Sequence, residues 1–156
     1  MKISGKRLDM PPVVIVPVLR GETETIFKVG AVLDFKEFEL LCPAPIPPMI
    51  KHKDAAEPVP DLKDKKYIDA CDKYARQRSS YMIIKSISHT ENLEWESVDL
   101  GKPETYSNYE KELRDAGLNH VEIGRLIGAV MEANGLDEAK IDEARKRFLA
   151  SKVVQA

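Results

Sequence analysis

The stretch Cys42-Pro-Ala-Pro-Ile-Pro-Pro-Met49 contains four prolines within six residues and separates two segments of different composition. Because proline fixes φ and lacks a backbone N–H, this stretch should run extended, in the manner of a polyproline II helix. Charged residues and two further prolines follow as far as Lys65. We therefore predict that residues 42–65 form a proline-rich, charged loop that connects two structured parts.

The segment before this loop, residues 12–41, is rich in β-branched and apolar residues. Residues 13–19 and 25–29 have the composition of strands and are separated by a polar turn that contains a glycine. This pattern predicts a β-hairpin or the start of a small antiparallel sheet, in which Pro17 favours an edge position or a bulge. Residues 31–41 fit both periods, so a strand and a short helix compete there.

The segment after the loop, residues 66–156, should be mainly helical. Apolar residues between Tyr67 and Met82 recur at three- and four-residue steps, as they do on one face of a helix. A second helix is expected from Pro103 to Ala116, with Thr105 as its N-cap and a glycine directly after its end.

Two more helices should follow. Asn119 with Glu122 approximates a capping box, and Asn134-Gly135 should end the helix that begins there. Gly124 and Gly128 lie inside this helix at a cost in stability, which favours a close approach of another helix. The last helix should begin near Asp137 and carry acid-to-base pairs at i,i+4, Asp142–Lys146 and Glu143–Arg147.

The fold class predicted from these segments is α+β. It comprises an N-terminal β-hairpin or small antiparallel sheet, a proline-rich connector and a mainly α-helical C-terminal part. The chain has 156 residues, close to the size of one domain of about 150 residues. A single domain over residues 1–156 is therefore expected.

Charge and composition exclude several classes of partner. Lys and Arg number 24 against 26 Asp and Glu, a net charge of −2, so binding to nucleic acid or to an anionic membrane has no bulk electrostatic support. The longest apolar run, residues 11–19, is shorter than the about 20 residues of a membrane span. Cys42 and Cys71 form no CxxC pair and should stay reduced. A cytoplasmic protein is expected.

Motifs for catalysis or cofactor binding are not found in the sequence. The chain has no GxSxG, no HExxH and no glycine-rich phosphate loop, and His52, His89 and His120 lie far apart from one another. The acidic pairs alternate with lysines and arginines, as on a solvated face. We expect a protein that is not an enzyme and holds no metal or cofactor.

The order of several short segments resembles a known family. They are Ala31-Val-Leu-Asp-Phe-Lys-Glu-Phe-Glu, Cys42-Pro-Ala-Pro-Ile-Pro-Pro, Leu93-Glu-Trp-Glu-Ser-Val, Pro103-Glu-Thr-Tyr-Ser-Asn-Tyr, Glu112-Leu-Arg-Asp-Ala-Gly-Leu, Asn134-Gly-Leu-Asp and Ala144-Arg-Lys-Arg-Phe-Leu. Over roughly residues 13–150 this order is similar to that of the small tail assembly chaperones of long-tailed bacteriophages.

The resemblance implies a non-enzymatic assembly factor of the host-cell cytoplasm. Such proteins bind the tape-measure protein and recruit tail-tube subunits, are absent from the finished particle, and often exist in a short and a frameshifted longer form. The family has no catalytic residue that could be carried over to this chain.

A tape measure is a long helical rod, and the apolar stripes on its surface would aggregate unless another protein covered them. The apolar residues that could bind such a stripe in helix-in-groove fashion are Leu126, Val130, Ile141, Phe148 and Leu149. The alternative, which a helical stripe ordinarily favours, is that these residues pack on one another in the chain's own core.

Two other classes of function remain open, as does self-association. A virion structural protein, or a head–tail or tail completion protein, could add the edge strand at residues 13–19 to a neighbour's sheet. A phage inhibitor of a host protein is the third class, for which a small acidic domain is also adequate.

Overall fold

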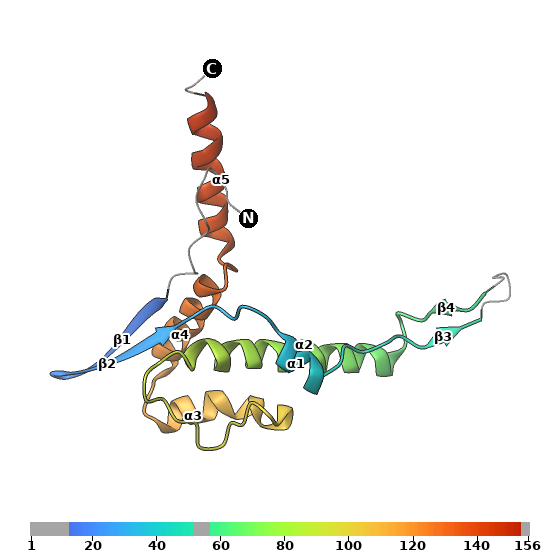
Figure 1. The fold of residues 1–156 in the computed structure, drawn as a ribbon, viewed down its shortest axis with the longest axis horizontal. Helices are drawn as coiled ribbons and strands as arrows, with labels where there is room; N and C mark the ends of the chain where they lie inside the picture. Colours follow the sequence, from blue (N-terminus) through green and yellow to red (C-terminus); the bar gives the residue numbers. More distant parts are fainter. Residues whose placement is uncertain (1–12, 52–56, 154–156) are drawn as a thin grey trace. The chain divides into compact units, whose positions relative to one another are not determined.

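A computed structural model describes residues 13–51 and 57–153, with side chains as far as Arg147 (Figure 1). The elements are β1 (Val14–Arg20), β2 (Thr23–Val29), α1 (Lys36–Leu41), β3 (Met49–Ile50), β4 (Val59–Pro60), α2 (Lys65–Ile87), the 3-10 helix η1 (Pro103–Asn108), α3 (Tyr109–Asp115), α4 (His120–Ala133) and α5 (Glu138–Val153). An antiparallel two-stranded sheet followed mainly by helices confirms the predicted α+β class. Within the described ranges, no helix combines the length and the apolar composition that a membrane span requires.

The chain divides into two compact units, which are described separately. Unit 1 comprises Met1–Val32, Lys85–Leu93 and Gly117–Ala156, and unit 2 comprises Leu33–Ile84 and Glu94–Ala116. The single domain expected over residues 1–156 stays a prediction.

Unit 1 is built on the β1–β2 hairpin and on α4. The strands pair in antiparallel register, with Pro17 opposite Ile26, and a two-residue turn joins them. Gly21, at the first turn position, has a φ of +62°, as a type II′ hairpin turn requires. Among the described residues this sheet has two strands, so Pro17 lies on an edge strand, one of the two positions predicted for it.

The two faces of the hairpin differ in burial. Its inner face, formed by Val16, Val18, Phe27 and Val29, is buried, whereas Ile15, Leu19 and Ile26 on the outer face are exposed. The hairpin packs on α4, whose buried stripe is Ile123, Leu126, Ala129, Val130 and Ala133 (Figure 1). This packing of one apolar face on another supplies most of the core of unit 1.

Local signals define both ends of α4. Gly117, with a φ of +92°, follows α3 as predicted, and the side chain of Asn119 accepts a hydrogen bond from the N–H of Glu122 in a complete capping box. Asn134 is the C-cap and Gly135 follows with a φ of +67°. The predicted start and end of this helix are therefore confirmed.

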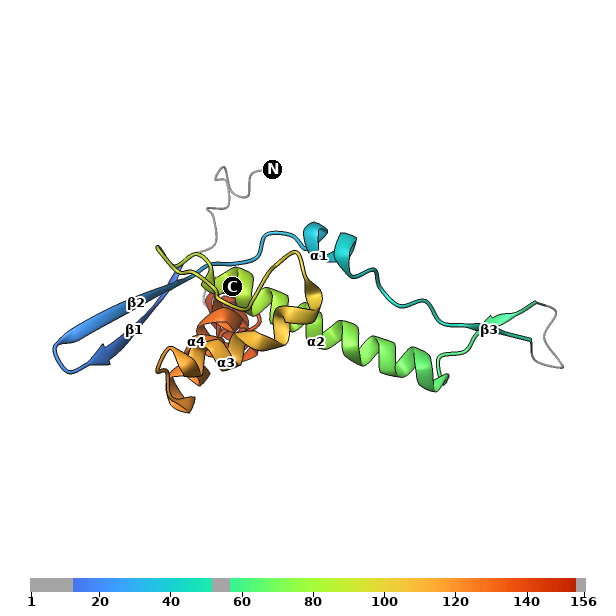
Figure 2. The same ribbon diagram turned by 90° about the horizontal axis from the view of Figure 1, so that it is seen from below.

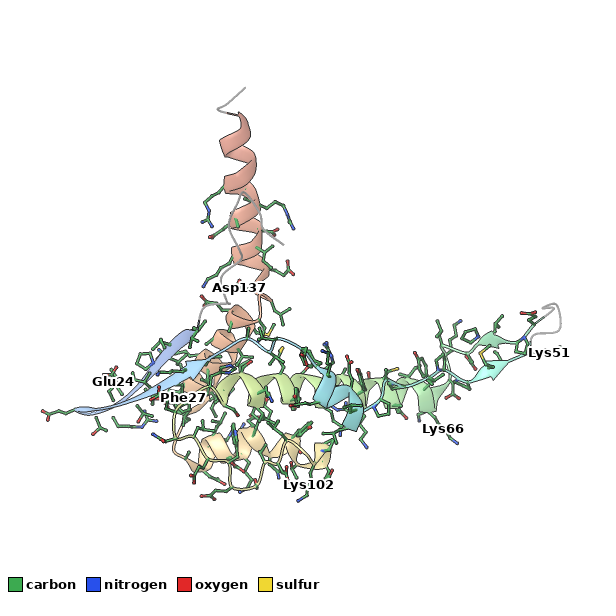
Figure 3. The ribbon with its side chains drawn as sticks, in the orientation of Figure 1. Glu24, Phe27, Lys51, Lys66, Lys102 and Asp137 are labelled. Carbon is green, nitrogen blue, oxygen red and sulfur yellow. The ribbon has the colours of Figure 1, made fainter. Side chains whose placement is uncertain are left out.

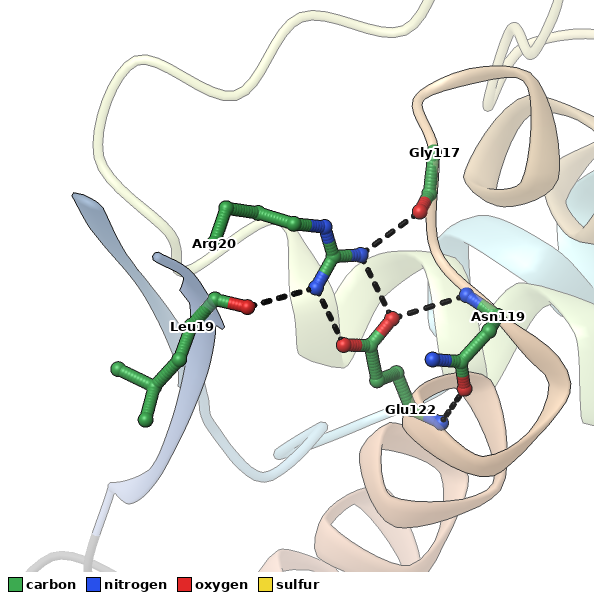
Figure 4. A network of polar contacts seen from close by, with 5 residues as sticks. All are labelled: Leu19, Arg20, Gly117, Asn119 and Glu122. Atoms are coloured by element: carbon green, nitrogen blue, oxygen red, sulfur yellow. Dashed lines mark hydrogen bonds and ion pairs between the residues drawn. The ribbon is translucent and has the colours of Figure 1, made fainter. Parts of the chain in front are cut away.

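A polar network joins β1 to the start of α4 (Figure 4). The Arg20 guanidinium donates to both carboxylate oxygens of Glu122 and to the carbonyl of Gly117, the latter at 2.7 Å. The same carboxylate accepts from the N–H of Asn119 at 2.9 Å, which closes the capping box. Arg20 also donates to the carbonyl of Leu19, so a backbone acceptor of β1 is already occupied.

A second network surrounds the end of β2. Asn134 accepts from the N–H of Val32 at 2.8 Å and donates to the hydroxyl of the buried Ser86 at 3.0 Å. The N–H of Gly30 donates to the carbonyl of Ser86 at 3.0 Å. The hydroxyl of Thr90 accepts from the N–H of Lys28 and donates to its carbonyl. These bonds satisfy backbone groups that a strand edge would otherwise leave open.

Unit 2 contains α1, most of α2, η1 and α3. Its centre is a cluster of aromatic rings with centroids 5.4–6.5 Å apart: Phe35, Phe38, Tyr74, Tyr81 and Tyr106. The buried hydroxyl groups have partners, since Tyr81 donates to Glu37 at 3.1 Å and Tyr106 donates to the carbonyl of Leu100 at 2.6 Å. Burial is the main cause that raises the pKa of Tyr81 and of Tyr106 to about 12.

Some elements of unit 2 differ from the sequence prediction. The competition within residues 31–41 is decided in favour of a helix from Lys36, because Phe38 is then buried among aromatic rings. Thr105 is not an N-cap. It lies inside η1, and its hydroxyl bonds to the backbone of Asp99 and Lys102. Among the described residues of the proline-rich loop, most have no regular structure, but Met49–Ile50 and Val59–Pro60 pair as β3 and β4 (Figure 1).

Candidate partner-binding groove

A groove of about 1270 Å³ lies within unit 2. Its walls come from residues 41–45 at the end of α1 and just beyond it, from residues 70–83 of α2 and from residues 103–110 of η1 and α3. Both ribbon views show η1 and α3 beside α2 (Figures 1 and 2). The volume exceeds the about 300–1,000 Å³ of a small-molecule pocket. The groove is therefore large enough for a segment of a partner protein.

The sequence forms these walls through local preferences. Tyr67, Cys71, Tyr74 and Gln77 are the half-buried residues of the first turns of α2, at four- and three-residue spacing, while their neighbours are exposed. Prolines after Cys42 prevent α1 from continuing and keep the next segment extended. A helical wall and an extended wall thus border the same hollow.

Gln77 joins the three walls. Its amide nitrogen donates to the carbonyl of Pro103 at 3.3 Å, and its amide oxygen lies 3.9 Å from the sulfur of Cys42, which donates to it. Tyr74 packs on Phe38 with ring centroids 5.4 Å apart. The groove is consequently preformed, which lowers the ordering cost of binding.

Tyrosines supply the aromatic surface of the groove. Tyr74 and Tyr109 are half-buried and line it together with the buried Tyr106. Burial raises the pKa of Tyr109 above its ordinary value. Tyrosine is enriched at energetically important interface positions because it offers a large apolar ring and a polar tip.

Charged residues also line the groove. Lys73 and Arg76 lie on α2, and Glu104 and Glu110 lie on η1 and α3. Burial is the main cause that raises the pKa of the Cys42 thiol, while Lys73 lowers it and Glu104 raises it by smaller amounts. A thiol with a raised pKa is a poor nucleophile. The arrangement is therefore better suited to binding than to covalent chemistry.

The structure places the predicted docking residues differently. Leu126 and Val130 are fully buried in unit 1, as the alternative of packing in the chain's own core predicts, so neither side chain is available as a docking face. The reason is that α4 uses this stripe to pack on the hairpin. Ile141 on α5 is 36% exposed, and the side chains of Phe148 and Leu149 lie outside the described residues.

The structure describes two of the three histidines considered as metal ligands or catalytic residues. His52 lies outside the described residues, His89 contacts the carbonyl of Ser86 through Nδ1 at 3.1 Å, and His120 is exposed at the start of α4. In the part of the chain that the structure describes, no three His, Cys, Asp or Glu side chains are grouped to hold a metal ion.

Gly124 and Gly128 are exposed, and no described atom lies within 4 Å of where their Cβ would be. The predicted close approach of another helix is therefore wrong for these residues.

Sequence reasoning did not predict the groove, although two signals pointed toward it. Tyr74 lies on the apolar helical stripe of residues 67–82, and Tyr106 and Tyr109 lie in and directly after a turn that begins with Pro103. Their convergence depends on contacts between residues far apart in the chain.

Comparisons with protein-family models, curated proteins and solved structures find no match for this chain.

Proposed function

We propose that the protein is a non-enzymatic tail assembly chaperone of a long-tailed bacteriophage, which binds tape-measure and tail-tube proteins in the host cytoplasm during tail morphogenesis. The similarity of its segment order to that family supports this proposal. The single structural observation in its favour is the preformed, tyrosine-lined groove of unit 2, which has the size for a protein segment.

The physical task of such a chaperone fits this groove. A tape measure is a long helical rod, and an apolar stripe on its surface would aggregate before the tube covers it. A groove with apolar and aromatic walls can cover part of that stripe in helix-in-groove fashion. An interaction of this kind needs no catalytic group.

Co-expression with the tape-measure protein of the same phage tests the proposal. We expect the soluble fraction of the tape measure, measured after high-speed centrifugation, to rise several-fold with the full chain and to fall when the chain is omitted. A tape measure that stays equally insoluble in both cases contradicts the chaperone function.

The two alternative classes give different results. A virion structural or completion protein would be recovered at fixed stoichiometry in purified particles, whereas a chaperone would be absent from them. The edge of β1 offers limited support for strand addition, because Pro17 lacks an N–H and Arg20 already binds the carbonyl of Leu19. Stable capture of one host protein without any tail protein would favour the inhibitor.

A further inference from the structure

We propose that the groove of unit 2 binds an amphipathic helix of the client protein, and that acidic residues border the apolar stripe of this helix where it runs along α2. This inference rests on the proposed chaperone function and states the chemistry of the segment that would be bound. It assigns Lys73 and Arg76 to the recognition of that acidic border, with Tyr74 and Tyr109 as the apolar anchors.

The length and shape of the groove fit a helix. Residues 70–83 of α2 line one wall, and at 1.5 Å per residue they extend over roughly 20 Å. A partner helix of about 13 residues has the same length and presents three or four apolar side chains on one face. The straight wall that α2 offers thus matches a straight helical rod.

Among the α2 residues that line the groove, the charged ones are Lys73 and Arg76, both basic, and the first half of α2 as a whole is also basic. Residues 65–78 contain five basic side chains (Lys65, Lys66, Lys73, Arg76 and Arg78) and two acidic ones (Asp69 and Asp72), a local net charge of +3, whereas the whole chain has a net charge of −2. A surface whose charge is opposite in sign to that of the whole chain favours a partner with acidic residues.

The two basic residues that line the groove are available for a partner. Among the residues that the structure describes, Lys73 and Arg76 make no ion pair or side-chain hydrogen bond, whereas Arg78 stacks on Phe35 with its guanidinium carbon 4.0 Å from the ring centroid. On the opposite wall the charged lining residues are Glu104 and Glu110, both acidic, and Glu110 pairs with Arg114. Carboxylates of a bound helix would therefore find their partners mainly on α2.

Tyr74 and Tyr109 provide the anchors for the apolar stripe. Both line the groove and both are half-buried, so each ring can still lose exposed apolar surface when a partner binds. Tyrosine rings in partly desolvated pockets often contribute most to the affinity of an interface. The basic residues would then select which apolar helix binds and in which orientation.

Two labelled peptides test this inference directly. They share one leucine stripe and the same length, and the residues that border the stripe are glutamates in one peptide and lysines in the other. Fluorescence anisotropy with the full chain should show that the glutamate peptide binds about tenfold more tightly at physiological salt, with a smaller preference at 1 M salt. Equal affinity for both peptides at physiological salt would overturn the inference.

A matched pair of double variants places the recognition in the groove. Lys73→Glu with Arg76→Glu should reverse the preference, so that the lysine peptide binds more tightly. Lys65→Glu with Lys66→Glu changes the charge equally on the same helix but outside the groove lining, and should keep the original preference. If both variants change the preference equally, the general field of α2 is responsible and the inference fails. Circular dichroism melts check that both variants fold.

Co-expression with the tape measure separates this inference from the proposed function. If the wild-type chain solubilises the tape measure and the Lys73→Glu, Arg76→Glu variant does so equally well, the inference is overturned and the chaperone function stands. If the wild-type chain has no effect, the chaperone function falls, while the peptides still test the groove.

Discussion

The carboxylate of Glu122 closes the capping box of α4 and also binds the guanidinium of Arg20. The hydrogen bond from Arg20, with a further contribution from the N–H of Asn119, lowers the pKa of Glu122 to about 2. An unfolded glutamate has a pKa of about 4.3. The ionised group therefore stabilises the folded state above about pH 4.3, and this gain is lost as the pH falls toward 2.

A glutamine at this position tests the pH dependence. Glu122→Gln should be less stable than the wild type at pH 7, because it removes the charge that binds Arg20, and the difference should shrink between pH 4.3 and 2. Urea unfolding at a series of pH values measures it. Glu39→Gln, at an exposed position on α1, should show no comparable change. A difference that is the same at pH 7 and pH 2 would contradict the assignment.

Gly30 has a steric role rather than a conformational one. It is buried after β2, and a Cβ built on it would lie 2.5 Å from Cδ2 of His89. Gly30→Ala should therefore lower the free energy of unfolding by about 1–3 kcal/mol, as overpacking does. Adding His89→Ala to this variant should restore most of the loss. A single variant as stable as the wild type in thermal melts would show that His89 moves aside without cost.

At the scale of elements, α4 carries two glycines without a packing role. Gly124 and Gly128 face open space among the described residues, so alanine fits there and reduces the entropy of the unfolded chain. Each substitution by alanine should raise the free energy of unfolding by about 0.5–1 kcal/mol, and the two effects should add. Gly117→Ala is the control and should destabilise, because its φ of +92° strains any residue with a Cβ. Destabilisation by Gly124→Ala or Gly128→Ala in urea titrations would indicate a contact that this structure does not contain.

The helix α5 contrasts with α4. After Asp137 its side chains extend from both sides of the ribbon in the view of Figure 3. Residues 138–147 are exposed, and Arg145 pairs with Asp142 instead of the i,i+4 pairs that the sequence predicts. Most helical stability in proteins comes from tertiary packing of an apolar face. Because its described side chains are exposed, α5 gains little of this stabilisation within the described part of unit 1.

At the scale of the whole molecule, this difference predicts unequal protection from hydrogen exchange. Amides of α5 should exchange much faster than those of α4, whose apolar stripe is buried under the hairpin. Exchange followed by mass spectrometry at neutral pH measures both helices in one experiment. Equal protection would mean that another surface, such as a partner or a second copy, covers α5. A concentration series then separates these cases, because only self-association depends on the concentration of this chain alone.

The sequence by itself determined the features that depend on neighbouring residues. Backbone φ preferences and hydrogen bonds over a few residues determine three features: the hairpin, the capping box of Asn119 and Glu122, and the helix ends at Gly117 and Gly135. The α+β class follows from them, because hydrophobic period and proline position are local properties too.

Only the tertiary structure decided which apolar stripes are buried and where the groove lies. A stripe such as Leu126 and Val130 has the same helical period whether it packs on the chain's own hairpin or on a partner, so periodicity could not separate the two. Thr105 likewise is a residue type that favours N-caps. It lies instead inside the 3-10 helix η1, where its hydroxyl hydrogen-bonds to the backbone of Asp99. The groove brings together residues 41–45, 70–83 and 103–110, whose convergence depends on contacts between distant segments that no local pattern encodes.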